Sequence, residues 1–315
     1  AQRLAMKDRT LLRVRNAPIV RGQTRWRSMP LLATRPLSAR MTPGRTNPVA
    51  RPVIQNGLAG KRVALFPGCM TENLYPGQGE ALVRVLQELG ASVAYPEGLH
   101  CCGLPALNSG DVRHGTWMAR QTITALEAID VDYIVSGSAS CVATITQDYL
   151  HVFRHEPAWH ERAASIGARV IDFTSLIDEV AQLPAGSLAH GEPRTIAYHD
   201  SCQGLNALNL RAAPRRILHD VLGHEVRDLR ESRLCCGFGG SFSFEYPEIS
   251  ARLMTRKLDD ISDTGVMEVV TDNQGCILQL RGGADAQGRK LQVRHLAELL
   301  AEGIDATRRN ARDLG

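Results

Sequence analysis

The sequence predicts an α/β protein made of two tandem, duplicated βαβ-type domains with mainly parallel sheets. From residue 62 onward, short β-branched or apolar runs alternate with longer amphipathic segments, which is typical of βαβ units. This alternation occurs twice, and the cysteines recur with it at a nearly constant interval. Each cysteine falls just after an expected strand, so we expect the cysteine loops at the carboxyl ends of the strands.

The first half contains four expected strands with helices between them. The helix at 79–89 is predicted by Leu82, Val85, Leu86 and Leu89, whose spacing places them on one helical face. The expected strands are 63–66, 92–95, 133–136 and 169–173, and the expected helices are 79–89, 112–129 and a segment after 174.

The second half repeats this plan. Pro247 is expected at the first position of a helix, where its missing N–H has no cost. The expected strands are 195–198, 225–229, 266–270 and 291–293, and the expected helices are 215–222, 247–261 and 295–300.

These elements divide the chain into five parts. The expected parts are a basic, disordered N-terminal arm at 1–60, a first domain at 61–183, a linker at 184–193, a second domain at 194–304 and a C-terminal tail at 305–315. The arm is rich in Arg, Pro and Thr and lacks hydrophobic periodicity, and the linker is marked by its Pro and Gly residues.

Charge is distributed unevenly along the chain. Residues 1–60 contain eleven Arg and one Lys against one Asp, so they carry about +11, whereas the remaining residues carry about −7. The folded part is therefore mildly acidic, and we expect no nucleic-acid partner for it. The arm is interpreted either as a mitochondrial-type transit peptide or as sequence upstream of a misplaced start, with Met6 or Met41 as alternative starts. A dispensable tail is favoured over a functional targeting or RNA-binding arm.

Two absences in the sequence bear on location. It contains no uninterrupted apolar run of the length that a membrane-spanning helix needs, so we expect no integral membrane contact. The opening residues AQRLAMKDRT lack the apolar core of a secretory signal. We expect a cytoplasmic protein that reaches the inner face of a membrane only through partners. In the reducing cytoplasm, thiols serve as metal ligands or redox groups.

The eight cysteines form two sets of four in register. The difference in sequence number is 133 from Cys69 to Cys202, 134 from Cys101 to Cys235, 134 from Cys102 to Cys236 and 135 from Cys141 to Cys276. Both adjacent pairs are followed by glycine. Three loops at the carboxyl edge of a parallel sheet can bring one, two and one thiols to one point, so each half presents four candidate ligands.

Four thiolates suit either a 4Fe-4S cluster or a tetrahedral zinc ion. Structural zinc sites usually contain a Cys-x2-4-Cys knuckle, which this chain lacks. Adjacent cysteines fit a single ion poorly, whereas a cluster offers several iron atoms, and Gly103 and Gly237 allow turns closed to other residues. The pattern favours a cluster over zinc and over a redox dithiol, with both alternatives left open.

Other candidate groups carry weaker signals. The run Gly237-Phe-Gly-Gly240 lacks the third glycine and the acid of a dinucleotide fingerprint, and we expect neither flavin nor NAD on this chain. His100, His199 and His295 fall near the cysteine loops or a strand end, and each is interpreted as structural rather than as a ligand.

The cysteine pattern resembles the duplicated cysteine-rich (CCG) domain family. The residues that carry the resemblance are Cys69, His100-Cys-Cys-Gly103, Cys141, Cys202, Cys235-Cys-Gly-Phe-Gly-Gly240 and Cys276. The family includes a component of heterodisulfide reductase, the glycolate oxidase iron-sulfur subunit and lactate utilisation protein A, and the run from Leu234 to Ser250 is most similar to the last. Unlike heterodisulfide reductase, this chain has Ser138 and Asn273 where Cys-x-x-Cys would begin. Each half is therefore expected to hold either an ordinary cubane on four thiolates or a non-cubane cluster in which an oxygen or nitrogen ligand replaces the missing sulfur.

The resemblance implies an iron-sulfur oxidoreductase subunit that binds two 4Fe-4S clusters and transfers electrons as lactate, or a related 2-hydroxy acid, is oxidised to pyruvate for growth. Its implied partners are a ferredoxin-type iron-sulfur subunit and a third lactate-utilisation subunit, and activity is expected only with them. The alternatives are a heterodisulfide-reductase-like thiol/disulfide enzyme and a zinc-stabilised assembly subunit without redox turnover.

Overall fold

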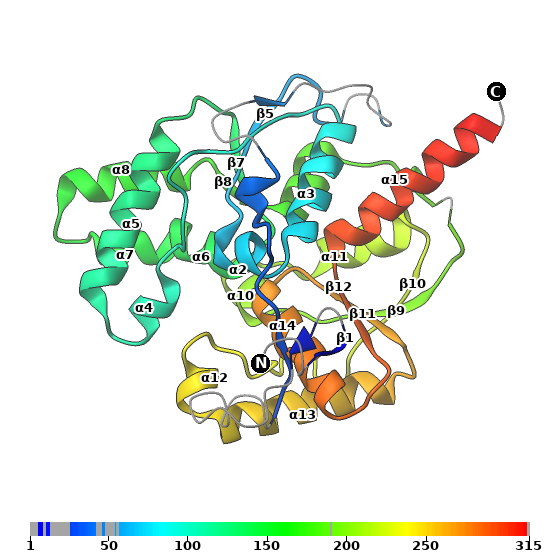
Figure 1. Cartoon of the computed structure of the whole chain (residues 1–315). Coiled ribbons are helices and arrows are strands. Elements are labelled where there is room, and N and C mark those ends of the chain that lie inside the picture. The colour runs from blue at the N-terminus through cyan, green and yellow to red at the C-terminus, as the bar shows by residue number, and fades with distance from the viewer. Residues whose placement is uncertain are drawn as a thin grey trace.

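The structure is a computed structural model that describes residues 26–41, 57–189 and 191–313, together with residue 54 and backbone stretches at 6–8, 11–12 and 46–47. Each half of the chain forms one sheet whose main strands are parallel, so the predicted α/β class and its duplication are confirmed (Figure 1). In the first sheet the strands are β5 (Arg62–Leu65), β6 (Ser92–Ala94), β7 (Tyr133–Ser136) and β8 (Val170–Asp172). In the second they are β9 (Thr195–Tyr198), β10 (Glu225–Arg227), β11 (Glu268–Thr271) and β12 (Gln292–His295).

The two sheets have the same strand order, because β6-β5-β7-β8 in the first corresponds to β10-β9-β11-β12 in the second. A short strand, β4 (Thr46–Asn47), adds to the edge of β6 in antiparallel fashion. The remaining strands, β1 (Met6–Asp8), β2 (Leu11–Leu12) and β3 (Met29–Pro30), form a small antiparallel sheet of their own.

Helices separate the strands of the first half. They are α2 (Gly68–Asn73), α3 (Pro76–Glu88), α4 (Leu104–Asn108), α5 (Val112–Glu127), α6 (Ala139–Ala143), α7 (Tyr149–Val152), α8 (Pro157–Gly167) and α9 (Phe173–Ser175). π-Helical segments at Thr144–Asp148 and Leu176–Ala181 continue α6 and α9. Helix α3 begins with Pro76 at its first position and is followed by Gly90, whose φ of 97° ends the helical path.

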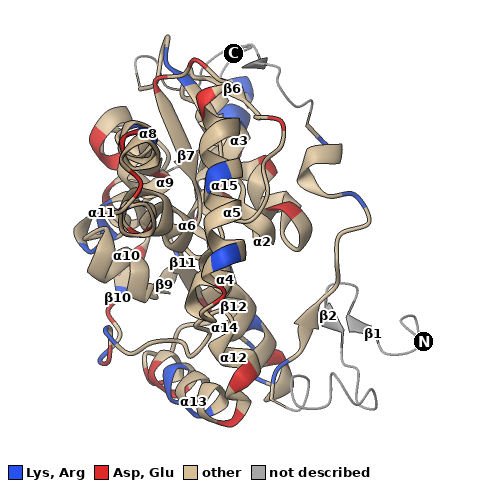
Figure 2. Ribbon diagram, turned by 90° about the vertical axis from the view of Figure 1, so that its left-hand side faces the viewer, with Lys and Arg blue, Asp and Glu red and all other residues tan. Residues whose placement is uncertain are grey.

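The second half contains α10 (Cys202–Ala207), α11 (Ala212–Arg216), α12 (Phe242–Glu245), α13 (Pro247–Asp263), α14 (Gln274–Ala286) and α15 (Leu296–Asp313). A π-helical segment at Ile217–Val221 extends α11. Helix α13 carries both acidic and basic residues (Figure 2). Within the described ranges, no helix combines the length and the apolar character that crossing a membrane requires.

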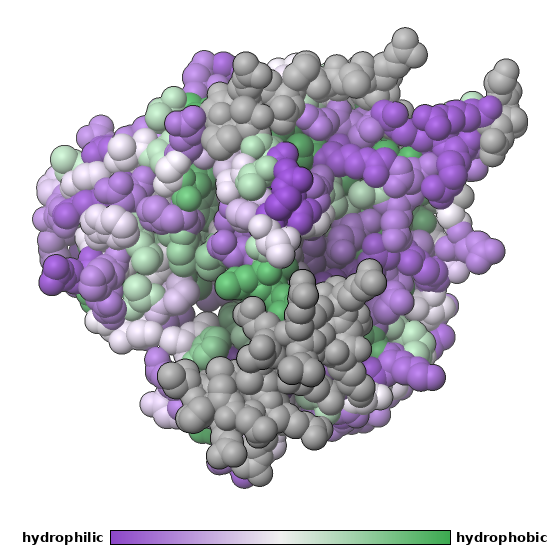
Figure 3. All heavy atoms as spheres, in the orientation of Figure 1, coloured by the Kyte–Doolittle hydropathy of each residue, from purple (hydrophilic) through white to green (hydrophobic). Residues whose placement is uncertain are grey.

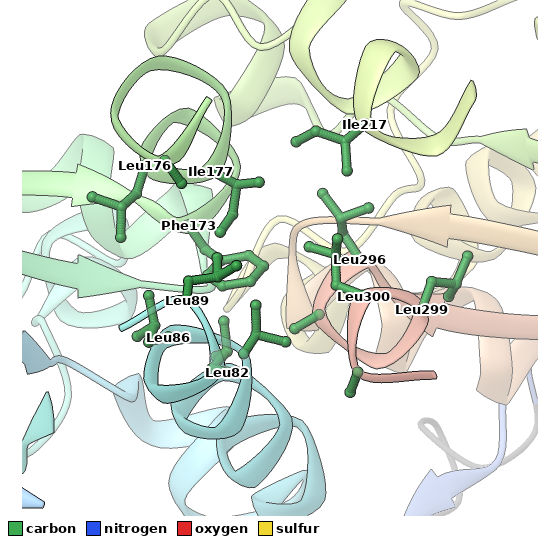
Figure 4. Close-up of a cluster of buried hydrophobic side chains, with 14 of the residues drawn as sticks. Leu82, Leu86, Leu89, Phe173, Leu176, Ile177, Ile217, Leu296, Leu299 and Leu300 are labelled. Carbon is green, nitrogen blue, oxygen red and sulfur yellow. The ribbon is translucent and has the colours of Figure 1, made fainter. Parts of the chain in front are cut away.

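One hydrophobic core joins the two halves. Helix α3 of the first half packs against α15 of the second, and leucines from both helices meet Phe173 and Ile177 in a single buried cluster (Figure 4). Leu82, Leu86 and Leu300 are fully buried there, and burial of each such side chain contributes about 1.5–3 kcal/mol. The relative placement of the two cysteine-bearing sheets is therefore held by packing.

The structure departs from the sequence expectation at both ends of the chain. Part of the expected disordered arm, residues 26–41, packs on the body, with Leu37 fully buried in the shared core and the Ser28 N–H bonded to the Gly282 carbonyl. A few apolar contacts outweigh the Arg- and Pro-rich composition there, and most of the remaining arm lies outside the described residues. Helix α15, expected to end at Leu300, continues to Asp313 and includes most of the expected tail.

Candidate metal centre

All eight cysteines line one cavity of about 130 Å³ between the two halves. The cavity lies where the carboxyl ends of both sheets face each other, bordered by α4 on one side and by the loop before α12 on the other. Figure 3 shows hydrophobic residues around a hollow between the parts of the molecule that carry α4 and α12. The duplicated loops therefore converge on a common place, with one set of thiols from each half.

The cysteines of both halves occupy equivalent positions in the fold. Cys69 and Cys202 lie in the first turns of α2 and α10, and Cys141 and Cys276 lie in the first turns of α6 and α14. The adjacent pairs Cys101-Cys102 and Cys235-Cys236 lie in the loops after β6 and β10. Helix N-termini favour negative charge, so this placement suits thiolates and the anionic group that they would hold.

Burial follows the same symmetry. Cys102 and Cys141 are buried in the first half, as are their counterparts Cys236 and Cys276 in the second. Cys69, Cys101 and Cys235 are partly exposed and Cys202 is exposed. All eight are free thiols, and the sulfurs of Cys236 and Cys276 lie 3.3 Å apart. Each half thus combines two inner thiols with two that face the more open part of the cavity.

The glycine after each adjacent pair is required by the backbone. Gly103 has a φ of 91° and Gly237 a φ of 83°, in the left-handed region that favours glycine. A side chain at Gly237 would also place its Cβ 2.5 Å from the Ser250 carbonyl oxygen. The N–H of Gly103 donates to the Cys101 sulfur at 3.5 Å, and that of Gly237 donates to the Cys235 sulfur at 3.3 Å. These turns aim both thiols of each pair at one point.

The thiols of each half interact strongly with one another. Hydrogen bonds from Cys102 and then Cys69 lower the pKa of Cys101 to about 3, and burial opposes this shift. The hydrogen bond to Cys101 is in turn the largest cause that raises the pKa of Cys102. Because neighbouring thiols share protons in this way, a metal that binds them must displace those protons.

The second half repeats this electrostatic pattern. Hydrogen bonds from Cys202 and then Cys236 lower the pKa of Cys235 to about 2. The pKa of Cys276 falls to about 6, first through its hydrogen bond with Cys236, while burial opposes the shift and the nearby His199 contributes to it. The order of contacts from Cys202 to Cys276 matches that of the first half, so each half forms its own set of four.

Ser138 and Asn273 also line the cavity. Both precede a cysteine-bearing helix as its N-cap, and the Asn273 side chain accepts a hydrogen bond from the Gly275 N–H at 3.0 Å. Ser138 lies 3.1 Å from Ser140, oxygen to oxygen. The Asn273 side chain therefore caps the helix that presents Cys276, whereas Ser138 occupies the equivalent position before Cys141 without a side-chain capping bond.

The three histidines singled out in the sequence take different places. His199 is buried against Cys236 and Cys276, and one ligand atom from each of the three residues lies within 4.8 Å of the others. His100 stacks on Trp117 with a ring-centre distance of 5.7 Å, and His295 bonds to the Gly137 carbonyl. The structural interpretation suits His100 and His295, whereas it missed the position of His199 beside the thiols.

A duplicated α/β unit that presents four thiols from the ends of its parallel strands in each half defines a cysteine-rich class of protein. The chain belongs to the cysteine-rich (CCG) domain family, which it matches twice, over residues 63–146 and 196–281. The resemblance seen in the cysteine pattern is thereby confirmed. The two matched segments contain all eight cysteines.

Several named proteins are similar to this chain in sequence. The chain is 35% identical over 242 residues to lactate utilization protein A of an Exiguobacterium species, covering 77% of this chain and 98% of that protein. The corresponding protein of Bacillus cereus is 35% identical over 239 residues, or 76% and 98% of the two chains. The probable glycolate oxidase iron-sulfur subunit of Bacillus subtilis is 33% identical over 244 residues, and the match spans 54% of its length.

Solved structures resemble the chain only distantly. An Asp/Glu racemase homologue from Yersinia pestis gives a TM-score of 0.30 at 12% identity, covering 78% of this chain and 99% of that one. The aspartate racemase of Picrophilus torridus gives a TM-score of 0.32 at 8% identity, covering 79% and 94%. Likeness at this level supports no statement about function.

Proposed function

We propose that this chain is an iron-sulfur electron-transfer subunit of a complex that oxidises L-lactate, or a related 2-hydroxy acid, to pyruvate. One observation carries the proposal: the eight thiols meet at one cavity in two sets of four. The named relatives support the lactate pathway and the iron-sulfur cofactor. In this proposal the matched segments extend to domains at 61–183 and 194–304, joined by the linker at 184–193.

Each half holds one four-iron cluster in this proposal. The ligands of the first are Cys69, Cys101, Cys102 and Cys141, and those of the second are Cys202, Cys235, Cys236 and Cys276. A bound cluster supplies one-electron transfer. The protein's own contribution is to hold four thiolates on three loops, to donate Gly N–H groups to the outer sulfur of each adjacent pair, and to bury the inner thiols away from water.

The donor chemistry fits a cluster better than a single ion. Two sets of four thiolates match the Cys ligation of 4Fe-4S clusters. In each half the ligands come from two helix N-termini and one loop that carries an adjacent pair, rather than from the short knuckles of structural zinc sites. Because both sets line the same cavity, electrons can pass between the two centres inside this chain before they reach a ferredoxin-type partner.

Reconstitution with the partner subunits tests the lactate assignment. The chain is purified anaerobically, mixed with a ferredoxin-type subunit and a third lactate-utilisation subunit, and given lactate, while its visible spectrum and pyruvate are measured. We expect bleaching of the iron-sulfur absorption only in the complete mixture. If the isolated chain instead reduces small disulfides and lactate has no effect with partners present, the heterodisulfide-reductase-like alternative is correct.

A further inference from the structure

The duplication preserves the cysteines but changes residues beside them, among them His100, whose counterpart is Leu234, and Phe66, whose counterpart is His199. The backbone N–H of Phe66 donates to the Val135 carbonyl at 2.8 Å, and the backbone N–H of His199 donates to the Val270 carbonyl at 2.9 Å. Both residues lie immediately after the first strand of their half and three residues before its first cysteine. Phe66 and His199 are therefore structural counterparts.

Their surroundings are equivalent as well. Phe66 is fully buried in one apolar cluster with Cys102 and Cys141. His199 is 1% exposed and lies with Cys236 and Cys276 in a group whose ligand atoms are within 4.8 Å of one another. The first pair of inner thiols thus faces an aromatic hydrocarbon ring, whereas the second faces an imidazole.

The imidazole of His199 lacks the partners that a buried polar group requires. Neither of its ring nitrogens makes a hydrogen bond of normal geometry within the described part of the chain. Leaving a buried donor unsatisfied costs about 1–3 kcal/mol. The Ser201 hydroxyl is already engaged, since it donates to Asp272 at 2.8 Å and accepts from the Gly204 N–H. The sulfurs of Cys236 and Cys276 are acceptor atoms that lie beside the His199 ring, in a group whose ligand atoms are within 4.8 Å of one another.

We propose that His199 donates an N–H···S hydrogen bond to the inner thiolates of the second centre and makes the two clusters unequal in reduction potential, the second being higher. This inference rests on the proposed cluster in each half. Hydrogen bonds to the sulfurs are one of the determinants of cluster potential. A reduced cluster carries one more negative charge than an oxidised one, so a donor stabilises the reduced form more. Phe66 offers no such donor, and electrons collect at the second centre.

His199 acts through the thiolates rather than on a substrate, so its test is a potential measurement. Each cluster is observed alone, the second in a Cys102→Ser background and the first in a Cys236→Ser background, by redox titration followed by EPR. We expect His199→Phe to keep the iron of the second cluster and to lower its potential toward that of the first. The reciprocal change, Phe66→His, should raise the potential of the first cluster.

His199→Gln serves as the matched control because it keeps an N–H donor and should retain part of the higher potential. An unchanged potential in His199→Phe would overturn the inference. Loss of the second cluster's iron in His199→Phe would also overturn it, since it would make the imidazole a ligand. If the wild-type chain binds no iron at all, the proposed function is wrong. Iron analysis of the wild-type chain shows this before any variant is compared.

Discussion

The imidazole of His295 joins the two halves of the molecule through the backbone of Gly137. His295 is fully buried at the end of β12, and its Nε2 lies 2.7 Å from the Gly137 carbonyl oxygen in the first half. Its Nδ1 accepts a hydrogen bond from the Ala297 N–H at 3.1 Å, so Nε2 carries the proton and donates it. Gly137 precedes Ser138, the N-cap of the helix with Cys141, and the second half thereby supports the first cysteine centre.

Replacing His295 by Gln should destabilise the protein by about 1–3 kcal/mol, because the buried Gly137 carbonyl and Ala297 N–H lose well-placed partners. Urea unfolding of the purified chain measures the change. His160→Gln, at an exposed position on α8, is the matched control and should leave the free energy of unfolding nearly unchanged. Equal stability of the two variants would contradict the role of His295.

The same contact should make stability depend on pH. Burial lowers the pKa of His295 below 6.5, so below that pH the unfolded chain binds a proton more readily than the folded one. The contribution of His295 is present above pH 6.5 and is lost as the pH falls through the folded-state pKa. We expect wild type to lose more unfolding free energy than His295→Gln between about pH 7 and pH 5; parallel curves would refute this assignment.

The two cysteine centres should lose iron independently. Cys236→Ser removes an inner ligand of the second set and should remove about half of the bound iron, because four-thiolate ligation is broken in one half only. Cys102→Ser is the symmetric control and should remove the other half, while the double variant should bind almost none. Iron per chain after anaerobic purification is the measurement. Full retention in Cys236→Ser would remove that residue from the ligand set.

Alanine substitutions at two glycines near the second centre distinguish the cost of a steric clash from the cost of backbone strain. Gly237 and Gly240 both have positive φ, of 83° and 62°, but only Gly237 lacks room for a Cβ, which would lie 2.5 Å from the Ser250 oxygen. We expect Gly240→Ala to cost about 1–2 kcal/mol and Gly237→Ala to cost more and to release iron from the second centre. Thermal unfolding and iron content give both readings, and similar losses in both variants would count against the clash.

The hydrophobic core between the halves should contribute more to the free energy of unfolding than the ion pairs around it. Leu300→Ala leaves a cavity in the cluster between α3 and α15 and should cost about 2–5 kcal/mol. Arg84→Ala breaks a pair with Asp305 on the same two helices, but both side chains are 41% exposed, so it should cost about 0–1 kcal/mol. Chemical unfolding of both variants tests the order, and a larger effect from Arg84 would contradict the dominance of packing at this interface.

Much of this architecture could be predicted because its signals are local and repeated. The strands before each cysteine are short β-branched runs, and the spacing of Leu82 and Leu86 is visible within one helix. Helix α14 was not predicted from the sequence. It contains Gly282 and Gly283, which lower helix propensity. In the structure, a Cβ at Gly282 would overlap the Ser28 carbonyl and one at Gly283 would overlap Met254. Only the tertiary contacts explain why glycine stands there.

The site shows the same division. The register of the cysteines was sufficient to group them in fours, since the loop positions follow from a parallel sheet. The position of His199 beside Cys236 and Cys276 was missed because a histidine near a loop is usually structural. Its counterpart Phe66 precedes it by the same interval that separates Cys69 from Cys202, and extending the comparison beyond the cysteines would have revealed the difference.

The central claim is that each half holds a four-iron cluster on its four thiolates. Its most direct test is the content of iron, acid-labile sulfide and zinc per chain after anaerobic purification, with visible and low-temperature EPR spectra of the same sample. We predict about eight irons with matching sulfide, as two 4Fe-4S clusters require. Stoichiometric zinc without sulfide would contradict the claim and make the cysteine centres structural.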